Sequence, residues 1–233
     1  SHSTPMPTMI NRVIGKIKGK VSGPSVVFFA GIHGNEPAGV HALEDVFGKL
    51  VEDDINGTVY GFTGNLKALE ANQRYLVEDL NRIWTKERIR DLQTKTNLNE
   101  EEREQKELLY ILNDILKSDP GPFYFIDIHT TSSKTLPFIT INDAIINRNF
   151  SKLFPVPIVL GIEEYLNGPL LSYINELGYV SLGFESGQHE DEKAIINSIS
   201  FIYLTLVYSK TIALEKVIDF PVHYNRLKTD QKG

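Results

Sequence analysis

The chain has 233 residues, of which 41% are hydrophobic and 23% are charged, with a formal net charge of −6 and no cysteine. This size suits one large globular domain. The lack of a basic stripe argues against a nucleic-acid partner, and no apolar run reaches the roughly 18 residues of a membrane span. The first residues, SHSTPMPTM, lack the apolar core of a signal peptide, so we expect a cytoplasmic protein. Without thiolates, any metal site must use His, Asp or Glu.

The first part of the chain predicts strands that alternate with a helix. Residues 10–20 alternate apolar and polar side chains, which predicts an edge strand that ends near Gly23-Pro24. The continuous apolar run 25–32 predicts a strand buried on both faces. Apolar residues at helical spacing follow from Glu36, and a further strand is predicted over 57–62.

The second part repeats this alternation. Residues 99–117 predict an amphipathic helix in which Asn99 is the N-cap and Glu102 completes a capping box. Helices are also predicted over 168–177 and from near Asp191. Further strands are predicted over 123–129, 137–141, 155–162 and 179–185. Strands that alternate with helices of this length predict an α/β fold with a largely parallel sheet.

Candidate functional residues close three of the apolar strands. His33 with Glu36, His129 and Glu185 each follow such a run, and parallel sheets gather functional groups at the carboxyl ends of their strands. A catalytic zinc site uses three protein ligands and an open position, for which two His and one Glu are an established set. The alternative is that these are hydrogen-bonded structural residues, since a single His-x-x-Glu pair is common by chance. For His189 we expect a role at a helix cap or at the rim of the site rather than as a ligand.

Four motifs carry a resemblance to a known family. GIHGNEPAG, GNLKALEANQRYLVEDLNR, DIHTT and GFESG occur in this order between residues 31 and 187. Together they resemble the succinylglutamate desuccinylase/aspartoacylase family of the wider zinc carboxypeptidase group. The resemblance implies a zinc-carboxypeptidase-like (phosphorylase/hydrolase-like) α/β fold, with a mixed, mostly parallel central sheet flanked by helices. It implies a catalytic domain over 10–213 and a short C-terminal tail over 214–233, the β-rich C-terminal segment of fuller members being absent or trimmed.

The resemblance also implies a metal centre and a catalytic acid–base group. His33, Glu36 and His129 match the ligands of one Zn²⁺ ion per chain. Glu185, in GFESG, matches the catalytic carboxylate, which accepts a proton from water and delivers it to the departing amine nitrogen.

Further motif residues match groups that hold the substrate. Arg74 matches the arginine that polarises the scissile carbonyl, and Asn81 with Arg82 match the pair that grips the α-carboxylate of the substrate. The planar donor set of an arginine suits a carboxylate in a way that lysine does not. Asp127 is expected to orient His129, with a salt bridge to an arginine such as Arg82 as the alternative.

These roles imply a zinc-dependent amidohydrolase, or deacylase, that cleaves the amide bond of an N-acyl amino acid or a similar small carboxylate-bearing amide. Two alternatives stay open: a metallocarboxypeptidase acting on short peptides, and a non-catalytic carboxylate-binding module. The expected partner is the small-molecule substrate, without nucleic acid or membrane, and a homo-oligomer stays open.

One departure from the family bears on the substrate. Aspartoacylase-like members carry an arginine shortly before the catalytic glutamate that binds the side-chain carboxylate of the substrate, and Asn175 stands at this position. This argues against N-acetylaspartate. Lys134 is the one nearby cation that we nominate for an acidic side chain, and Tyr165 and Tyr173 are expected to line the pocket.

Overall fold

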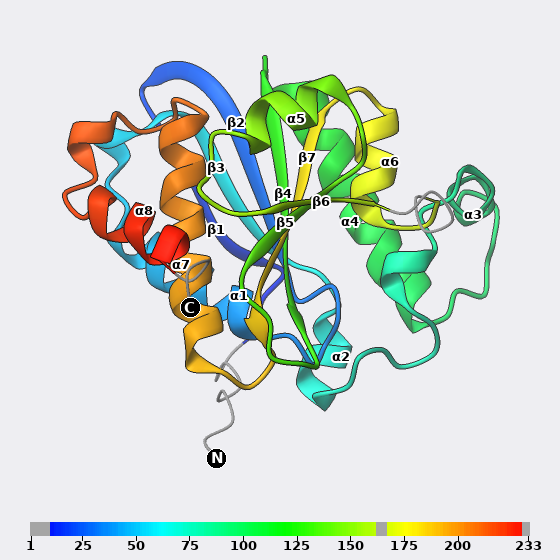
Figure 1. Cartoon of the computed structure of the whole chain (residues 1–233). Coiled ribbons are helices and arrows are strands. Elements are labelled where there is room, and N and C mark those ends of the chain that lie inside the picture. Colours follow the sequence, from blue (N-terminus) through cyan, green and yellow to red (C-terminus); the bar gives the residue numbers. More distant parts are fainter. Residues whose placement is uncertain (1–9, 162–166, 230–233) are drawn as a thin grey trace.

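The computed structural model describes residues 10–161 and 167–229 of the chain. Within these residues, seven strands form one central sheet with helices on both faces (Figure 1). The strand order is β1-β3-β2-β4-β7-β5-β6. The strands are β1 (Val13–Lys18), β2 (Val21–Ala30), β3 (Asn56–Thr63), β4 (Phe123–Thr131), β5 (Phe138–Ile141), β6 (Ile158–Leu160) and β7 (Val180–Gln188).

The middle of the sheet is parallel. Strands β3, β2, β4 and β7 pair in parallel, whereas β1 is antiparallel to β3, and β5 is antiparallel to β7. The carboxyl ends of the parallel strands therefore lie at one edge of the sheet, and the prediction of a mixed, mostly parallel α/β fold is confirmed. The edge position predicted for the first strand is also confirmed, since β1 pairs only with β3 in the described part of the chain.

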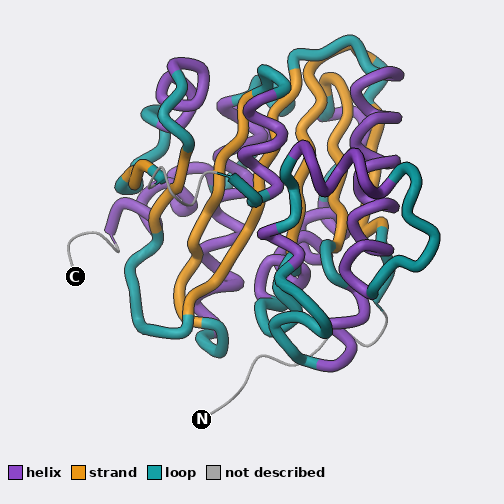
Figure 2. The backbone as a smooth tube through the Cα atoms, turned by 90° about the vertical axis from the view of Figure 1, so that its right-hand side faces the viewer, coloured by secondary structure: helices purple, strands orange, loops and turns teal. Residues whose placement is uncertain are grey.

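Helices cover the sheet in two layers. In Figure 1, α1, α7 and α8 lie on one side of the strands, and α4 and α6 lie on the other. Figure 2 shows the strands as a twisted layer with helices crossing in front of it. The α-helices are α1 (Ala38–Lys49), α2 (Leu66–Ala71), α3 (Lys86–Leu92), α4 (Glu100–Ser118), α5 (Ile145–Ser151), α6 (Leu170–Glu176), α7 (Glu192–Tyr208) and α8 (Phe220–Thr229). Short 3₁₀ turns are η1 (Glu52–Asp54), η2 (Leu80–Arg82) and η4 (Leu214–Lys216).

Strand β2 shows how the two layers are held. Successive side chains of a strand point to opposite faces, so Val26 and Phe28 enter the core beneath α1 and α7. Val27 and Phe29 enter the second core, with residues of α4 and α6. Full burial of a Val or Phe side chain contributes about 1.5–3 kcal/mol to folding. This two-sided burial explains why β2 is apolar without alternation from Val26 to Ala30.

Two strand boundaries differ from the predictions. The prediction that Gly23-Pro24 ends the first strand is wrong, because these residues lie inside β2, where the pairing with β3 shifts register between Val21 and Ser25. The strand predicted over 155–162 is reduced to β6, and residue 162 lies outside the described residues. Pro155 and Pro157 precede β6, and proline lacks the N–H that a ladder needs.

Helix α4 confirms one local prediction and adds a feature that the sequence did not indicate. The side chain of Asn99 accepts a hydrogen bond from the Glu102 N–H at 2.8 Å, and Glu102 accepts one from the Asn99 N–H at 2.9 Å, which completes the capping box. The first turns of α4 also bury Glu101 and Glu104. These acidic side chains face the segment between β3 and α3 rather than solvent.

The last described residues pack on the domain. Helix α8 lies along α7, and its Leu227 belongs to the same core as Phe201 of α7. The division into a domain over 10–213 and a tail over 214–233 stays a prediction. Among the helices of the described residues, none combines the length and the apolar character needed to cross a bilayer.

Candidate metal and substrate site

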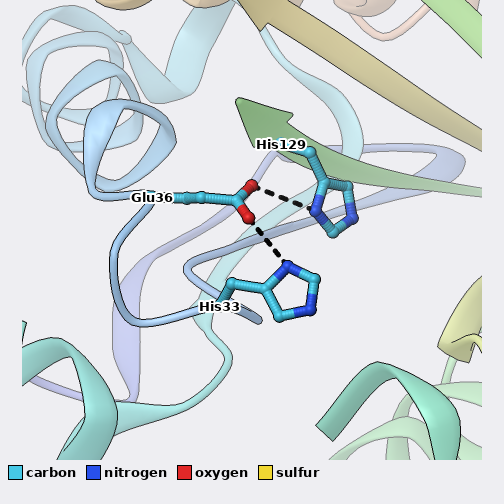
Figure 3. A group of neighbouring side chains, drawn as sticks. All are labelled: His33, Glu36 and His129. Carbon is cyan, nitrogen blue, oxygen red and sulfur yellow. Dashed lines mark hydrogen bonds and ion pairs between the residues drawn. The ribbon is translucent and has the colours of Figure 1, made fainter. Parts of the chain in front are cut away.

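Three predicted side chains meet at the carboxyl edge of the sheet. His33 and Glu36 lie in the turn between β2 and α1, and His129 lies near the end of β4 (Figure 3). The candidate ligand atoms of the three residues all lie within 4.8 Å of one another. Glu36 bridges the two rings: its Oε2 is 2.7 Å from His33 Nδ1, and its Oε1 is 3.3 Å from His129 Nδ1. Gly31, with a φ of 74°, turns the chain out of β2 in a conformation that costs glycine little.

An aspartate holds the outer nitrogen of each imidazole. His33 Nε2 lies 2.8 Å from Asp79 Oδ1, and His129 Nε2 lies 2.6 Å from Asp127 Oδ2. Asp127 thus contacts His129, as expected for a residue that orients this ring, rather than an arginine such as Arg82. Such pairs fix the ring with a proton on Nε2, which leaves Nδ1 as the lone pair for a metal. Asp79 is the first residue of the DLNR motif, yet no sequence pattern indicated its contact with His33.

The charges around the rings favour a cation. Burial by itself would raise the pKa of Glu36, but its hydrogen bonds to His129 and His33 hold that pKa below the usual range. Burial disfavours the charged form of His129, yet the carboxylates of Asp127 and Glu36 raise its pKa well above the ordinary value. The site therefore stabilises positive charge between the rings. Two imidazole nitrogens and a carboxylate, with no thiolate, form a donor set that fits Zn²⁺.

Glu185 lies beside this group on the neighbouring strand. It belongs to β7 and is paired in register with His129 of β4. Its Oε2 is buried and has no hydrogen-bond partner among the described residues. Burial raises the pKa of Glu185 to about 7, with a smaller contribution from the negative charges of Glu36 and Asp127 and an opposing one from His129. A carboxylate with this pKa can exchange a proton near neutral pH.

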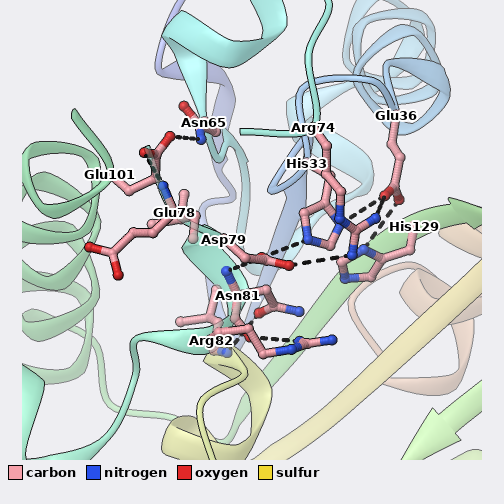
Figure 4. Close-up of polar contacts among 12 residues, drawn as sticks. His33, Glu36, Asn65, Arg74, Glu78, Asp79, Asn81, Arg82, Glu101 and His129 are labelled. Carbon is pink, nitrogen blue, oxygen red and sulfur yellow. Dashed lines mark hydrogen bonds and ion pairs between the residues drawn. The ribbon is translucent and has the colours of Figure 1, made fainter. Parts of the chain in front are cut away.

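A cavity of about 320 Å³ opens over the group, and it also contains the predicted substrate-binding residues. Arg74 lies 3.3 Å from Asp79 Oδ2 and 3.8 Å from Glu36 Oε2 (Figure 4). Asn81 accepts a hydrogen bond from the Leu170 N–H through its Oδ1 at 2.9 Å, so its Nδ2 group remains as the donor for a ligand.

The rest of the cavity wall is largely uncharged. Arg82, the second member of the predicted pair, lines the cavity and donates to the Asn81 carbonyl at 2.9 Å. Thr140, Asn142, Ser172 and Ser181 supply neutral polar groups to the same wall. Among the described lining residues, Arg74 and Arg82 are therefore the only arginine or lysine side chains.

Two further expectations for the pocket, those for Lys134 and Tyr173, are wrong. Lys134 lines a separate hollow next to β7 and α7 and does not line this cavity. Tyr173 packs against Trp84, with ring centroids 5.9 Å apart, because it points from α6 into the core. The Asn175 side chain donates to the Tyr179 carbonyl at 3.4 Å, outside the cavity wall. Tyr165 lies outside the described residues.

His189 supports the site from its edge. Its Nδ1 lies 2.6 Å from Thr130 Oγ1, and the Thr130 N–H donates to Glu36 Oε1 at 2.7 Å. His189 does not join the ligand group formed by His33, Glu36 and His129. His189 is thus linked to Glu36 through Thr130, and its expected place at the rim stays a prediction.

The fold and the site together define a class: mostly parallel α/β proteins with a His–Glu–His cation site beside a cavity at the carboxyl edge of the sheet. A family model described as the succinylglutamate desuccinylase/aspartoacylase catalytic domain matches residues 22–194, well over half of the chain. The chain belongs to the succinylglutamate desuccinylase/aspartoacylase family. The resemblance drawn from the four motifs is thereby confirmed.

Several relatives share parts of this chain. Succinylglutamate desuccinylase of Photorhabdus laumondii is 42% identical over 62 residues, which are 26% of this chain and 19% of that protein. The crystal structure of a succinylglutamate desuccinylase/aspartoacylase from Rhodobacter sphaeroides has a TM-score of 0.67 at 20% identity, covering 85% of this chain and 58% of that one. The product-bound ectoine utilization protein of Ruegeria pomeroyi has a TM-score of 0.67 at 18% identity, covering 84% and 60%. This chain thus spans less than two thirds of the length of these relatives.

Proposed function

We propose that this protein is a zinc-dependent amidohydrolase that removes the acyl group from a small N-acyl amino acid. The observation that supports the proposal most directly is the convergence of His33, Glu36 and His129, whose candidate ligand atoms lie within 4.8 Å of one another. An aspartate holds the Nε2 of each imidazole, and both Nδ1 atoms lie next to the carboxylate of Glu36.

The chemistry follows from the groups beside that point. When bound there, zinc supplies a Lewis acid and lowers the pKa of a coordinated water to about 7. Glu185, in the same cavity and with a pKa of about 7, accepts a proton from the attacking water and returns it to the amine nitrogen that leaves. Its buried, unpartnered Oε2 is the atom available for this transfer.

The arginines and Asn81 bind the substrate. Arg74 donates to the oxygen of the scissile carbonyl, where negative charge develops during attack. Asn81 Nδ2 and the guanidinium of Arg82 bind the α-carboxylate of the amino acid. Both residues sit on η2, whose backbone is fixed because the Asn81 N–H donates to Asp79 Oδ1 at 2.8 Å.

The cavity wall favours a substrate with a single carboxylate. Beyond Arg74 and Arg82, the described lining offers no arginine or lysine for a second acidic group, only neutral polar groups such as those of Thr140, Asn142 and Ser172. The names of the relatives include N-succinyl and aspartate-derived substrates, so we include these in the comparison. We expect N-acetyl derivatives of neutral amino acids to be hydrolysed faster than N-acetylaspartate.

A substrate panel tests the proposal. The purified protein is analysed for metal, and release of free amine is measured with N-acetyl neutral amino acids, N-acetylaspartate, N-succinylglutamate and unblocked dipeptides. We expect hydrolysis of an N-acyl amino acid that is lost after chelation and restored by Zn²⁺. Hydrolysis of dipeptides alone would make the protein a metallocarboxypeptidase, and binding without turnover would make it a carboxylate-binding module.

A matched pair of variants tests the role of Glu185. Glu185→Gln is expected to lower turnover by about 10²–10⁴-fold, the usual contribution of general acid–base catalysis, while zinc content is retained. Glu190→Gln removes the same charge from an exposed position five residues later and should keep wild-type turnover. Equal turnover in both variants would refute the proposed role of Glu185.

A further inference from the structure

The segment that joins α2 to η2 carries groups of the site but little apolar anchorage. Residues 72–79 form neither helix nor strand, and they include Arg74 and Asp79. Tyr75 is 42% exposed and Val77 is 56% exposed, so apolar burial does not fix this segment. Loops with few buried contacts open easily unless polar interactions hold them.

One buried carboxylate supplies those polar interactions. Glu101, in the first turn of α4, is 0% exposed. Its Oε1 accepts hydrogen bonds from the N–H groups of Val77 at 2.7 Å and Glu78 at 3.0 Å. Its Oε2 accepts from the Leu76 N–H at 3.0 Å and from Asn65 Nδ2 at 2.9 Å (Figure 4). Four donors match the roughly four lone-pair positions of a carboxylate.

The hydrogen-bond donors also keep Glu101 ionised. Burial alone would raise its pKa, but the N–H groups of Leu76, Glu78 and Val77 and the amide of Asn65 lower it below the usual value. Hydrogen bonds to an ionised acceptor are about twice as strong as neutral ones. No cation is paired with the Glu101 carboxylate among the described residues, so its charge is stabilised by the backbone of the segment itself.

A second contact fixes the same segment from its other side. The Glu78 side chain accepts hydrogen bonds from Arg88 at 2.9 and 2.6 Å and from Asn99 Nδ2 at 2.6 Å. Asn99 is the N-cap of α4, two residues before Glu101. The start of α4 therefore holds residue 78 through both its backbone and its side chain.

The residue that follows connects this anchor to the site. Asp79 binds His33 Nε2 at 2.8 Å, accepts from Arg74 at 3.3 Å and accepts from the Asn81 N–H at 2.8 Å. Displacement of the backbone at 76–78 would move Asp79 away from the imidazole of His33 and from the guanidinium of Arg74. Binding groups lose much of their effect when they shift by about 1 Å.

We propose that Glu101 is a positioning residue of the site: by binding the backbone N–H groups of Leu76, Val77 and Glu78, it sets Asp79 against His33 and Arg74. Glu101 touches neither the candidate metal ligands nor the cavity. Its effects on hydrolysis and on zinc affinity rest on the proposed function, whereas its effect on the 76–78 segment does not.

Glu101→Gln tests this role in the zinc-loaded 233-residue protein. Glutamine replaces one acceptor oxygen by an NH₂ group that faces a backbone N–H. Hydrogen exchange of the Leu76–Glu78 amides should rise at least about tenfold, as expected for loss of a charge-assisted hydrogen bond. Zinc affinity should fall by about tenfold through Asp79, the lower end of the effect seen for outer-shell partners of ligands. For an amide that the wild type hydrolyses, kcat/KM should fall by more than the loss of zinc alone explains.

Glu104→Gln is the matched control. Glu104 is also buried, lies three residues later on α4 and pairs with Arg12 and the Lys67 N–H rather than with 76–78. Both variants should lose stability, but only Glu101→Gln should release the 76–78 amides and weaken zinc binding. Equal changes in the two variants would overturn the proposal, since both would then act through global stability.

The proposal about Glu101 remains testable if the wild type shows no hydrolysis or if Glu101→Gln does not fold. If the wild type hydrolyses no amide of the panel, the proposed function fails, whereas the exchange of the 76–78 amides still decides the role of Glu101. If Glu101→Gln does not fold, Glu101→Asp is used, which keeps the charge but shortens the side chain by one methylene. Faster exchange confined to 76–78 in that variant supports the proposal, and wild-type exchange there overturns it.

Discussion

The contact between Asp79 and His33 gives a quantitative prediction for metal affinity. The 2.8 Å distance between His33 Nε2 and Asp79 Oδ1 lies in the range of charge-assisted hydrogen bonds. Removal of such a partner from a metal-binding histidine typically costs 10–100-fold in affinity, or about 1.4–2.8 kcal/mol. Asp79→Asn keeps an acceptor oxygen but loses the charge, so we expect the lower end. Asp79→Ala removes the contact and should reach the upper end.

Competition with a chromogenic zinc chelator at neutral pH measures this effect. Asp143→Asn is the control, because Asp143 is an exposed carboxylate that pairs with Arg148 outside the cavity. It removes the same charge and should leave the zinc dissociation constant unchanged. Thermal unfolding of the zinc-free proteins verifies that each variant is folded.

Two results of the zinc competition assay would refute this reasoning. If Asp79→Ala binds zinc as tightly as the wild type, His33 either does not bind the ion or does not need Asp79 to orient its ring. If Asp79→Ala and Asp143→Asn weaken zinc binding equally, the effect is one of net charge and not of the contact with His33.

Two other predictions concern stability. Arg12→Met removes the cation from the buried Glu104 and should lower the free energy of unfolding, measured by urea titration, by about 3–5 kcal/mol. Arg103→Met, at an exposed arginine of α4, should change it by less than about 0.5 kcal/mol. Similar values for the two variants would contradict the prediction. Burial lowers the pKa of His223, and Arg226 adds a smaller effect in the same direction. The contribution of the neutral imidazole to the free energy of unfolding is therefore full above the unfolded-state pKa near 6.5, and it is lost as pH falls towards the folded-state pKa. His223→Gln should therefore reduce the loss of unfolding free energy between neutral pH and pH about 5, and an unchanged loss would show that His223 is not responsible.

Much of the fold could be predicted because the responsible interactions are local. The apolar run of β2 indicates burial on both faces, and the Asn99–Glu102 spacing indicates a helix start, without reference to any distant residue. The boundaries were less predictable. Gly23-Pro24 looks like a strand end in isolation, but pairing with β3 on one side carries β2 through it with a shift of register.

The candidate site divides in the same way. Residue type and motif order selected His33, Glu36 and His129, and the structure brings their ligand atoms within 4.8 Å, although their role as zinc ligands stays a prediction. Lys134 follows His129 closely in sequence but lines a different hollow. Its direction depends on how the loop after β4 packs against β7 and α7, which residue spacing does not encode.

The acidic start of α4 shows most clearly what sequence patterns leave open. The run EEEREQKE has the composition of a solvated helix face, yet Glu101 and Glu104 are buried. The partners of Glu101 lie 23–36 residues earlier in the chain. The partners of Glu104, Lys67 and Arg12, lie 37 and 92 residues earlier. A sequence pattern predicts that a charged side chain is exposed, because the distant donors that replace its water in the folded protein cannot be identified from the pattern.

The sequence by itself determined the alternation of the main strands and helices, the cap of α4 at Asn99, and the residue types available for a cation and a carboxylate ligand. These depend on side-chain periodicity and chemistry, which act between near neighbours in the chain. The tertiary structure decided which aspartate holds each imidazole, where Glu185 lies relative to His129, and how Glu101 holds the segment before Asp79. The partner of a buried polar group is set by segments far apart in sequence, and only their packing brings donor and acceptor within reach of each other.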